Sequence, residues 1–424
     1  MNVREAALKT LYDIEFNGTY SNAAVKNALA YYKDMSAQDK PLFTELVYGV
    51  TDKRLTLDYY IKSMSKIKMK KISQYILIIL RMGIYQLLYT DKIPESAAVN
   101  ESVKLAKRYG HGASAGFVNG ILRNVKKTEI KYPEDKTEYL SVKYSYPVWI
   151  CEKWIKEFGF EFAAEMMAAS EKEKKITLRP NSLKTNAELL VKALAEENIT
   201  AHEENGAVVT DGFDISRSRL YNRGYYTPQD TAAMQAAIVL NPQPGETVID
   251  MCAAPGGKTT HMAELMKNEG IIYAFDKYDH KIKLIEKNAE RLDINIIKAS
   301  AADVTVPNTA FKETADKILC DVPCSGLGII GRKPDIKWNR EENADLTAIQ
   351  KKILENAVVY LKRGGEMVYS TCTVEREENE GVTGEFVKEH GEFEKLYEKT
   401  FYPHIDGTDG FYICKLKKRE TDNG

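Results

Sequence analysis

The chain has 424 residues, of which 44% are hydrophobic and 29% are charged, the composition of an ordinary globular protein. A chain of this length exceeds what one hydrophobic core serves, so we expect two or three domains. The longest strongly apolar run, residues 75–80, is far shorter than the about 20 residues of a membrane-spanning helix. Because residues 1–5 also lack the apolar start of a signal peptide, the sequence predicts a cytoplasmic protein without a membrane partner.

The net charge is only −1, but it is distributed unevenly along the chain. Residues 1–140 contain 22 Lys and Arg against 15 Asp and Glu, a balance of +7, and the remainder contains 38 against 46, a balance of −8. A basic first part joined to an acidic second part suggests that the first part faces a polyanion.

Residues 1–130 carry apolar side chains at three- and four-residue spacing and show no alternating strand pattern of useful length. One such face consists of Ile76, Ile79, Leu80, Ile84, Leu87 and Leu88. This period predicts helices, and Gly110 after Tyr109 is typical of a helix end. We therefore expect an all-α domain over residues 1–135.

Three segments of this domain are LRMGIYQLLY (80–89), IPESAAVNESVKLAKRYG (93–110) and GFVNGILRNV (116–125). They resemble the NusB-type RNA-binding helical domain. The resemblance implies an all-helical fold that contacts RNA or a protein partner.

Residues 140–225 mix two kinds of pattern. Segments 176–179 and 207–210 are strand-like, whereas 186–197 is helix-like. We expect a small α/β domain here.

From residue 226 onward, short β-branched runs alternate with helical stretches. We expect strands at 247–251, 271–276, 295–299, 317–321 and 366–370, with turns at 244–245 and 364–365. This alternation predicts a doubly wound, mainly parallel sheet, and therefore a Rossmann-like α/β domain over residues 226–424.

The first of these strands runs directly into a loop rich in small residues, which is followed by a helix. The loop comprises Cys252, Ala253, Ala254, Pro255, Gly256, Gly257 and Lys258. Small residues before a helix N-terminus let the backbone approach a ligand closely. A P-loop would need glycine where Cys252 stands, and the G-x-G-x-x-G pattern is also missing, so both phosphate-binding motifs are excluded.

Two acidic residues follow the next strands. Asp276 ends the second strand, where a carboxylate can accept both ribose hydroxyls, and Asp303 follows the third, where it can meet an adenine edge. With the loop they describe an adenosine pocket without a pyrophosphate site. This points to S-adenosylmethionine as the cofactor.

The six cysteines are sparse and include no C-x-x-C pair: Cys151, Cys252, Cys320, Cys324, Cys372 and Cys414. This spacing argues against a disulfide framework and against a zinc site, so we expect reduced thiols and no metal. Cys324 and Cys372 follow the fourth and fifth strands into loops, at the edge where ligands bind. The thiols of Cys151, Cys320 and Cys414 suit apolar filling.

Such a thiol pair suits methylation of cytosine carbon 5. A thiolate that attacks carbon 6 makes carbon 5 nucleophilic, and a base must later remove the carbon-5 proton. Asp321 is the candidate acid near ring nitrogen 3, and the target base must leave any helical stack. From the residues alone either thiol could attack, and a Pro-Cys dipeptide, as in DNA cytosine methyltransferases, favours Cys324.

Five segments carry a second resemblance: DMCAAPGGKT (250–259), DVPCSGLG (321–328), GRKPDIKW (331–338), YSTCTVEREENE (369–380) and DGFYICKLKK (409–418). They are similar to the Sun family of RNA 5-methylcytosine methyltransferases, and with the NusB-like region to its bacterial branch that acts on small-subunit (16S) ribosomal RNA. One departure is Gly331, where the family has a basic residue.

This resemblance assigns roles to the candidate residues. It implies that residues 252–258 bind the methionine part of S-adenosylmethionine, that Asp276 binds ribose and that Asp303 binds adenine. Asp321 would lie beside both cofactor and base. Cys372 would be the nucleophile, and Cys324 would assist product release.

The sequence thus predicts a monomeric enzyme that methylates carbon 5 of a cytosine in small-subunit ribosomal RNA. One alternative is a transfer-RNA cytosine methyltransferase with the same chemistry. Another is a non-catalytic RNA-binding ribosome assembly factor, against which the intact cysteines, Asp321 and loop argue.

Overall fold

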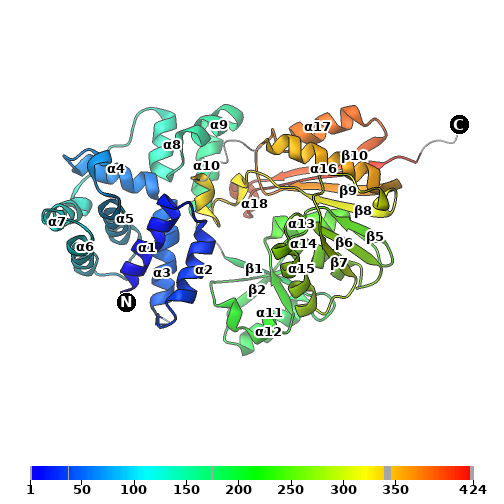
Figure 1. Cartoon of the computed structure of the whole chain (residues 1–424), viewed down its shortest axis with the longest axis horizontal. Helices are drawn as coiled ribbons and strands as arrows, with labels where there is room; N and C mark the ends of the chain where they lie inside the picture. The colour runs from blue at the N-terminus through cyan, green and yellow to red at the C-terminus, as the bar shows by residue number, and fades with distance from the viewer. Residues whose placement is uncertain (1, 37, 173–174, 339–344, 421–424) are drawn as a thin grey trace. The chain divides into compact units, whose positions relative to one another are not determined.

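The computed structural model describes residues 2–36, 38–172, 175–338 and 345–420 (Figure 1). Contacts divide the chain into two compact units. The helical unit is Met1–Glu171 with Arg332–Glu341, and the α/β unit is Lys172–Gly331 with Glu342–Gly424. Within the described ranges, no helix is both long and apolar enough to cross a membrane.

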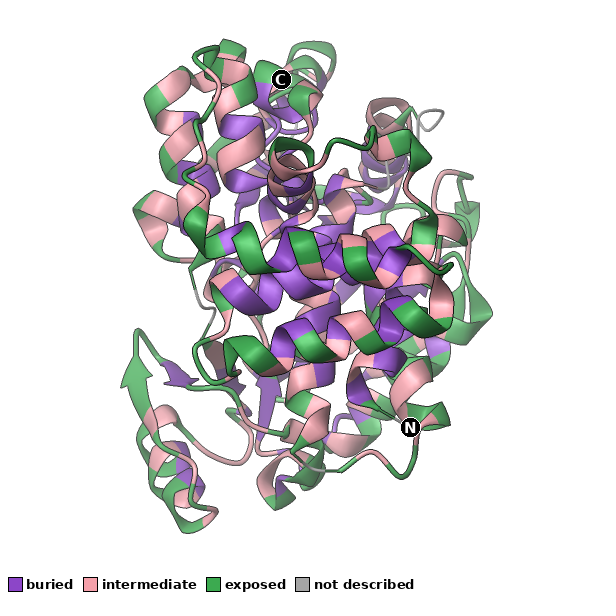
Figure 2. Ribbon diagram, turned by 90° about the vertical axis from the view of Figure 1, so that its left-hand side faces the viewer, coloured by how far each residue is buried: buried purple, intermediate pink, exposed green. Residues whose placement is uncertain are grey.

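The helical unit confirms the all-α prediction for the first part of the chain. Its central helix is α5, whose predicted apolar face is buried from Ile76 to Leu87, with Leu88 half-buried. Figure 2 shows buried residues where the helices of this unit face one another and exposed residues on their outer sides. The helices are α1 (Val3–Phe16), α2 (Ser21–Tyr31), α3 (Asp39–Asp52), α4 (Arg54–Met64), α5 (Gln74–Tyr89), α6 (Glu95–Tyr109), α7 (Ser114–Asn124), α8 (Lys136–Tyr144), α9 (Val148–Phe158) and α10 (Phe160–Glu171).

A short segment from far along the sequence completes the helical unit. Residues 332–338 include a 3₁₀ turn, Pro334–Lys337, and pack among its helices. Ser21 Oγ donates to Asp335 Oδ1 at 2.5 Å, and Lys337 Nζ lies 2.7 Å from Asp52 Oδ1. Asp335 and Lys337 are buried, and a buried charge is tolerated when it is paired in this way.

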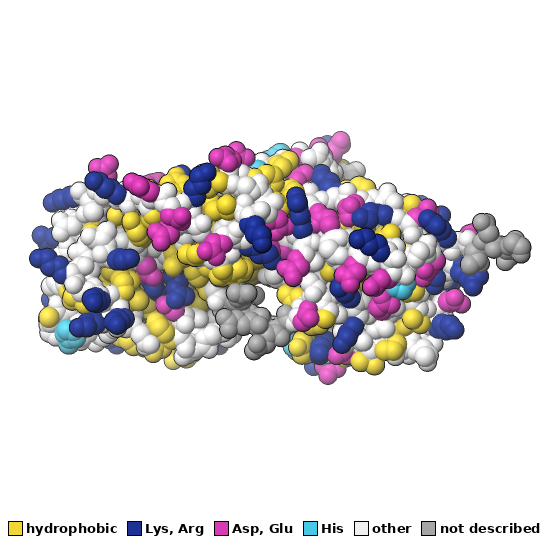
Figure 3. Space-filling model, turned by 90° about the horizontal axis from the view of Figure 1, so that it is seen from above, with side chains coloured by type: hydrophobic (Ala, Val, Ile, Leu, Met, Phe, Trp, Pro, Cys, Tyr) yellow, Lys and Arg dark blue, Asp and Glu magenta, His cyan; other side chains and the backbone are white. Residues whose placement is uncertain are grey.

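The charge of the helical unit is not gathered in one patch on the face seen in Figure 3. Lys and Arg side chains are spread over that surface, with acidic side chains between them.

The α/β unit begins with a small antiparallel sheet in the order β2-β3-β1-β4. The expected strands at 176–179 and 207–210 are found, and the expected helix starts after Asn186, whose side chain accepts from the Leu189 amide. The elements are β1 (Ile176–Pro180), α11 (Ala187–Glu196), β2 (Ala201–Glu204), β3 (Ala207–Thr210), α12 (Arg219–Asn222) and β4 (Tyr226–Pro228).

A seven-stranded sheet follows, in the order β10-β11-β9-β8-β5-β6-β7. Strands β5 to β9 are parallel, which confirms the Rossmann-like prediction, and β10 and β11 pair antiparallel beside β9. The strands are β5 (Thr247–Asp250), β6 (Ile271–Asp276), β7 (Ile297–Ala301), β8 (Ala315–Asp321), β9 (Leu361–Thr371), β10 (Phe393–Phe401) and β11 (Phe411–Lys418).

Helices cover both faces of this sheet, and each face has its own apolar core (Figure 1). One core is shared with α13, α14 and α15, and the other with α16 and α17. The helices are α13 (Thr231–Leu240), α14 (Gly257–Leu265), α15 (Asp279–Arg291), α16 (Leu346–Tyr360), α17 (Glu380–Glu389) and α18 (Pro403–Asp406).

Two local expectations were wrong, and two strands were missed. Strand β7 begins two residues later than predicted, and the antiparallel strands β10 and β11 were not expected. The turn expected at residues 364–365 lies inside β9, where Gly364 has φ +75° and the pairing with β8 shifts register. A bulge absorbs the left-handed glycine, so the strand continues through it.

Candidate active site

The candidate residues lie along one edge of the large sheet, where the parallel strands end. The Ala253 amide donates to Phe275 O at 2.7 Å, which joins the loop after β5 to β6. The Ala302 amide donates to Asp276 O at 3.0 Å, which joins the end of β6 to the loop after β7. At the other side of β5, strands β8 and β9 end together, with Asp321 opposite Ser370.

The loop after β5 turns tightly into α14. Gly256 has φ +101°, and a Cβ there would lie 3.2 Å from Ile285 Cα, whereas a Cβ on Gly257 would meet open space. Asn288 Nδ2 of α15 donates to Pro255 O at 2.9 Å. Cys252 contributes its backbone to this loop, while its side chain packs against the apolar core. Because residues 256 and 257 are both glycines and the space at Gly257 is open, a ligand can approach this part of the backbone closely.

Asp250, at the end of β5, is a functional candidate that the sequence analysis did not single out. Its Oδ2 accepts from Thr259 Oγ1 at 2.7 Å, and its Oδ1 has no partner among the described residues. Burial raises the pKa of Asp250 to about 7, and the nearby charge of Asp321 adds to the shift. Asp250 thus ties the strand to the first turn of α14.

Lys258 and Asp321 form an ion pair between the loop and the end of β8. Lys258 Nζ donates to Asp321 Oδ2 at 2.7 Å, and Ser370 Oγ donates to Asp321 Oδ1 at 2.8 Å. Burial lowers the pKa of Lys258, but the charges of Asp321 and Cys372 outweigh burial and raise it overall. The ammonium of Lys258 therefore lies within the electrostatic reach of Cys372.

The two loop cysteines are side by side. Cys324 Sγ lies 3.2 Å from Cys372 Sγ, which is a hydrogen-bond contact and too long for a disulfide. Their loops are also joined through the backbone, because the Gly328 amide donates to Cys372 O at 3.0 Å. A Cβ on Gly328 would lie 2.1 Å from Gly410 O, so only glycine fits there.

Two buried side chains that the sequence analysis did not assign hold the loop of Cys324. Glu378 Oε2 accepts from the Ser325 amide at 3.0 Å and from Gln350 Nε2 at 2.9 Å. Gln350 Nε2 also donates to Pro323 O at 3.0 Å. The hydrogen bond with Cys372 and burial raise the pKa of Cys324 well above its usual value, and the Glu378 carboxylate adds to this shift.

The two acidic residues beyond the loop have different environments. Asp276 is buried, and its Oδ1 has long contacts with Lys281 (3.3 Å) and the Tyr278 amide (3.4 Å); in the described chain its Oδ2 has no partner. The Asp303 side chain is 38% exposed, and its oxygens are held by Thr305 (2.6 Å) and Lys277 (3.0 Å). The hydrogen bonds from Thr305 and Lys277 lower the pKa of Asp303 to about 2.

The remaining cysteines lie inside the packed cores. Cys151, Cys320 and Cys414 are fully buried. Burial raises the pKa of Cys151 and Cys414 to about 12 and that of Cys320 in the same direction. These thiols have the environment of apolar filler.

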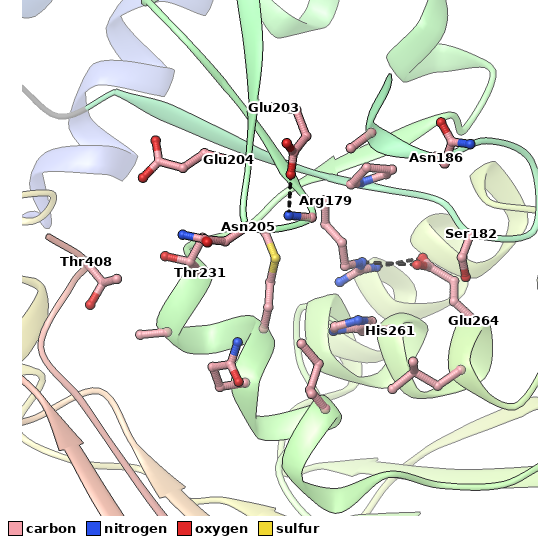
Figure 4. A pocket seen from close by; sticks show the side chains of 18 of the residues that line it. Arg179, Ser182, Asn186, Glu203, Glu204, Asn205, Thr231, His261, Glu264 and Thr408 are labelled. Atoms are coloured by element: carbon pink, nitrogen blue, oxygen red, sulfur yellow. Dashed lines mark hydrogen bonds and ion pairs between the residues drawn. The ribbon is translucent and has the colours of Figure 1, made fainter. Parts of the chain in front are cut away.

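A cavity of about 1010 Å³ lies elsewhere in the α/β unit, and neither Cys324 nor Cys372 lines it. Its wall comes from the small sheet, α13, α14 and β10. Figure 4 shows the buried pair of Arg179 and Glu264 in that wall, beside His261.

Three family descriptions match the chain. Residues 237–417 match 16S rRNA methyltransferase RsmB/F, residues 1–127 match the NusB family, and residues 146–218 match an RsmF/B-like ferredoxin-like domain.

Curated relatives match over the whole chain. A Bacillus subtilis protein named probable ribosomal RNA small subunit methyltransferase B is 37% identical over 99% of each chain. A Photorhabdus laumondii protein named ribosomal RNA small subunit methyltransferase B is 30% identical over 91% of this chain and 92% of its own. Among solved structures, PH0851 has a TM-score of 0.81 at 27% identity over 97% of both chains. A methyltransferase homolog protein from Pyrococcus horikoshii has a TM-score of 0.57 at 28% identity over 68% of this chain and all of its own.

Proposed function

Because this chain belongs to the family of 16S rRNA methyltransferases RsmB/F and is an S-adenosylmethionine-dependent rRNA methyltransferase, we propose that it methylates carbon 5 of a cytosine through a covalent cysteine–cytosine intermediate. The observation that carries the proposal is the pair of thiols at 3.2 Å, beside the Lys258–Asp321 ion pair. Carbon 5 of cytosine is too weak a nucleophile without such help, because only addition to carbon 6 makes it enamine-like.

The cofactor would lie along the sheet edge next to these thiols. We assign its methionine part to residues 252–258, its ribose to Asp276 and its adenine to Asp303, with Asp321 between cofactor and base. The open space at Gly257 and the unpartnered Oδ2 of Asp276 fit a ligand with hydroxyl and amino donors. Asp303 would share its oxygens among Thr305, Lys277 and the adenine, which a carboxylate with about four acceptor sites allows. When bound, S-adenosylmethionine supplies an electrophilic methyl group.

The charges around the two thiols favour Cys372 as the nucleophile. Since the charge of Cys372 helps raise the pKa of Lys258, the Lys258 ammonium in turn favours the Cys372 thiolate. Cys324 has the opposite neighbour, because the Glu378 carboxylate accepts from the adjacent Ser325 amide and disfavours a negative charge on Cys324. Two thiolates at 3.2 Å would also repel, so one ionises first.

In the first step, the Cys372 thiolate attacks carbon 6 and forms the S–C6 bond. The electrons of the C5=C6 bond move toward ring nitrogen 3, which takes a proton from the Lys258–Asp321 pair. We assign Asp321 as the member of this pair that contacts the base. Because Asp321 is a carboxylate in the ion pair, the proton comes from the Lys258 ammonium through Asp321, and Lys258 stays a neutral amine until nitrogen 3 returns the proton. Carbon 5 can then accept the methyl group while it still carries its own proton.

In the second step, Cys324 acts as the base. Once the Cys372 sulfur is bonded to carbon 6, it no longer carries a negative charge next to Cys324, so Cys324 loses its thiol proton to solvent more easily. The Cys324 thiolate removes the carbon-5 proton, the C5=C6 bond reforms and the S–C6 bond breaks. The Cys372 thiolate leaves, and nitrogen 3 returns its proton.

Bisulfite sequencing of ribosomal and transfer RNA, from cells with and without this protein, tests the proposal. We expect one protected cytosine in small-subunit ribosomal RNA to become convertible when the protein is absent, and to be restored by the wild-type chain but not by Cys372→Ala. Loss of protection only in transfer RNA would support the alternative substrate. No change in either RNA would support an assembly factor.

A further inference from the structure

The small sheet of the α/β unit holds the helix that follows the proposed cofactor loop. Arg179, in β1, is buried and extends its guanidinium to α14 (Figure 4). Its Nη1 donates to Gly257 O at 2.7 Å, and its Nη2 donates to Glu264 Oε1 at 2.7 Å and to Thr260 Oγ1 at 3.1 Å. One side chain therefore spans the first residue of α14 and its last turn.

The same small sheet also holds α15, which follows β6 and Asp276. Arg291, the last residue of α15, donates from Nη1 to Tyr226 O at 2.9 Å and to Tyr221 O at 3.0 Å. A Cβ on Gly224 would lie 2.0 Å from Arg291 O, so the two backbones touch. Both helices that lead away from the proposed cofactor residues are thus attached to the small sheet.

The contact with Gly257 goes beyond packing between two parts of one unit. A cation near a helix N-terminus opposes the helix dipole, so the position of Arg179 is unfavourable without a compensating charge. Glu264 supplies that charge from within the same helix. The hydrogen bond from Arg179 also fixes the direction of the Gly257 carbonyl, and hence of the Lys258 amide, which lies in the same peptide plane.

We propose that Arg179 is a positioning residue for S-adenosylmethionine, which holds the loop of residues 252–258 in its binding conformation through the Gly257 carbonyl. The inference rests on the proposed cofactor site. It gives the small α/β domain a role in cofactor binding, although no residue of that domain was assigned to the cofactor.

The test separates cofactor affinity from stability in the full-length protein. We expect R179M to weaken binding of S-adenosylmethionine about tenfold in calorimetric titration and to lower the urea midpoint, because Glu264 is left buried without its partner. In E264Q, Arg179 still reaches Gly257, so the midpoint should fall while affinity stays within about twofold. R179M/E264M removes both buried charges, so the midpoint should recover while affinity stays about tenfold weaker. R179K keeps the charge for Glu264 but lacks the fork that reaches two acceptors, so affinity should fall here as well.

Two results would overturn the proposal. One is wild-type affinity in R179K and R179M/E264M, which would reduce Arg179 to a structural ion pair. The other is failure of all three Arg179 variants to fold, which would make Arg179 a requirement of the fold and not of the cofactor. D276A distinguishes this from an error in the cofactor site itself. If D276A binds the cofactor like wild type, the assigned site is wrong whatever the Arg179 variants do.

Discussion

The two ends of the sheet edge differ in how firmly their side chains are held. At the cysteine end, Asp321 accepts from both Lys258 and Ser370, and Glu378 and Gln350 fix the backbone beside Cys324. At the ribose end, Asp276 has only long contacts and Asp303 is partly exposed. The difference suits the proposed reaction. Bond-making groups gain from a fixed geometry, whereas a cofactor that must be exchanged in every turnover needs an accessible site.

The largest effect on activity should come from replacing the two cysteines at the cysteine end. We expect Cys372→Ala to lose methyl transfer by at least about 1,000-fold, because this variant lacks the thiol that we assign to the attack on carbon 6. Cys324→Ala should still attack and accept the methyl group, then stall with the RNA bonded to Cys372. Denaturing gels with labelled RNA would show a slow protein–RNA band for Cys324→Ala and none for Cys372→Ala.

Cofactor titration is the control for this pair, since both variants should bind S-adenosylmethionine like wild type. The reverse pattern of bands would exchange the two roles. Full activity without a band in both variants would make these thiols structural.

The next largest effect should distinguish the two acidic residues at the ribose end, Asp276 and Asp303. Asp276→Ala removes a carboxylate with a vacant oxygen, and each hydrogen bond to a charged group contributes about 1.5–3 kcal/mol, so affinity for S-adenosylmethionine should fall at least about tenfold. Asp303→Ala should have a smaller effect, because its oxygens are already shared with Thr305 and Lys277. Calorimetric titration measures both. Equal losses would contradict the contrast between the two residues.

A smaller effect concerns the charge beside Cys324. Its pKa is raised by the Cys372 hydrogen bond, by burial and by Glu378. In a Cys372→Ala background the first cause is absent, so the pH at which Cys324 reacts with iodoacetamide should fall. Adding Glu378→Gln should lower it further, because a negative charge is removed. Peptide mass spectrometry across a pH series follows the reaction. A pH profile that Glu378→Gln leaves unchanged would show that Glu378 acts only through the Ser325 amide.

The smallest effect should come from Asp250, between the two ends. Burial raises its folded pKa to about 7, whereas the unfolded value is about 3.9. The folded state therefore favours the protonated acid. The resulting penalty is absent below the unfolded pKa, grows as pH rises through this interval and is complete above about pH 7. Asp250→Asn should be more stable than wild type at pH 8, by about 1 kcal/mol or more, and should lose this advantage near pH 4. Urea unfolding at several pH values checks this, and a constant difference would mean that Asp250 does not titrate there.

Much of the fold follows from local pattern. The spacing on α5 and the β-branched runs of β5, β6 and β8 predicted elements that the structure confirms, and the resemblances to NusB and to RNA methyltransferases are confirmed by the family matches. Strand ends also locate Asp276, Asp321 and the two cysteines, because in a parallel sheet such ends share an edge.

Other features depend on contacts that no local pattern encodes. Glu378 lies in the loop between β9 and α17, and Gln350 lies in α16, so the two residues act together on the Cys324 loop only because α16 packs against β9 and α17. Arg179 and Glu264 form a buried ion pair although they lie 85 positions apart in the sequence. The identity of the attacking thiol was open from the residues alone, since it depends on which charge lies beside each sulfur.

The segment of residues 332–338 has a consequence for how the chain is synthesised. Asp335 pairs with Ser21 across 314 positions, and Lys337 pairs with Asp52 across 285. At about 5–20 residues per second, translation delivers these partners about 15–60 s after the first helices leave the ribosome. During that interval Asp52 lacks Lys337 and Ser21 lacks Asp335, although the helices α1 to α10 have already been synthesised. The nascent helical unit therefore forms these two contacts only after most of the α/β unit has been synthesised. A chain truncated before residue 332 cannot form them.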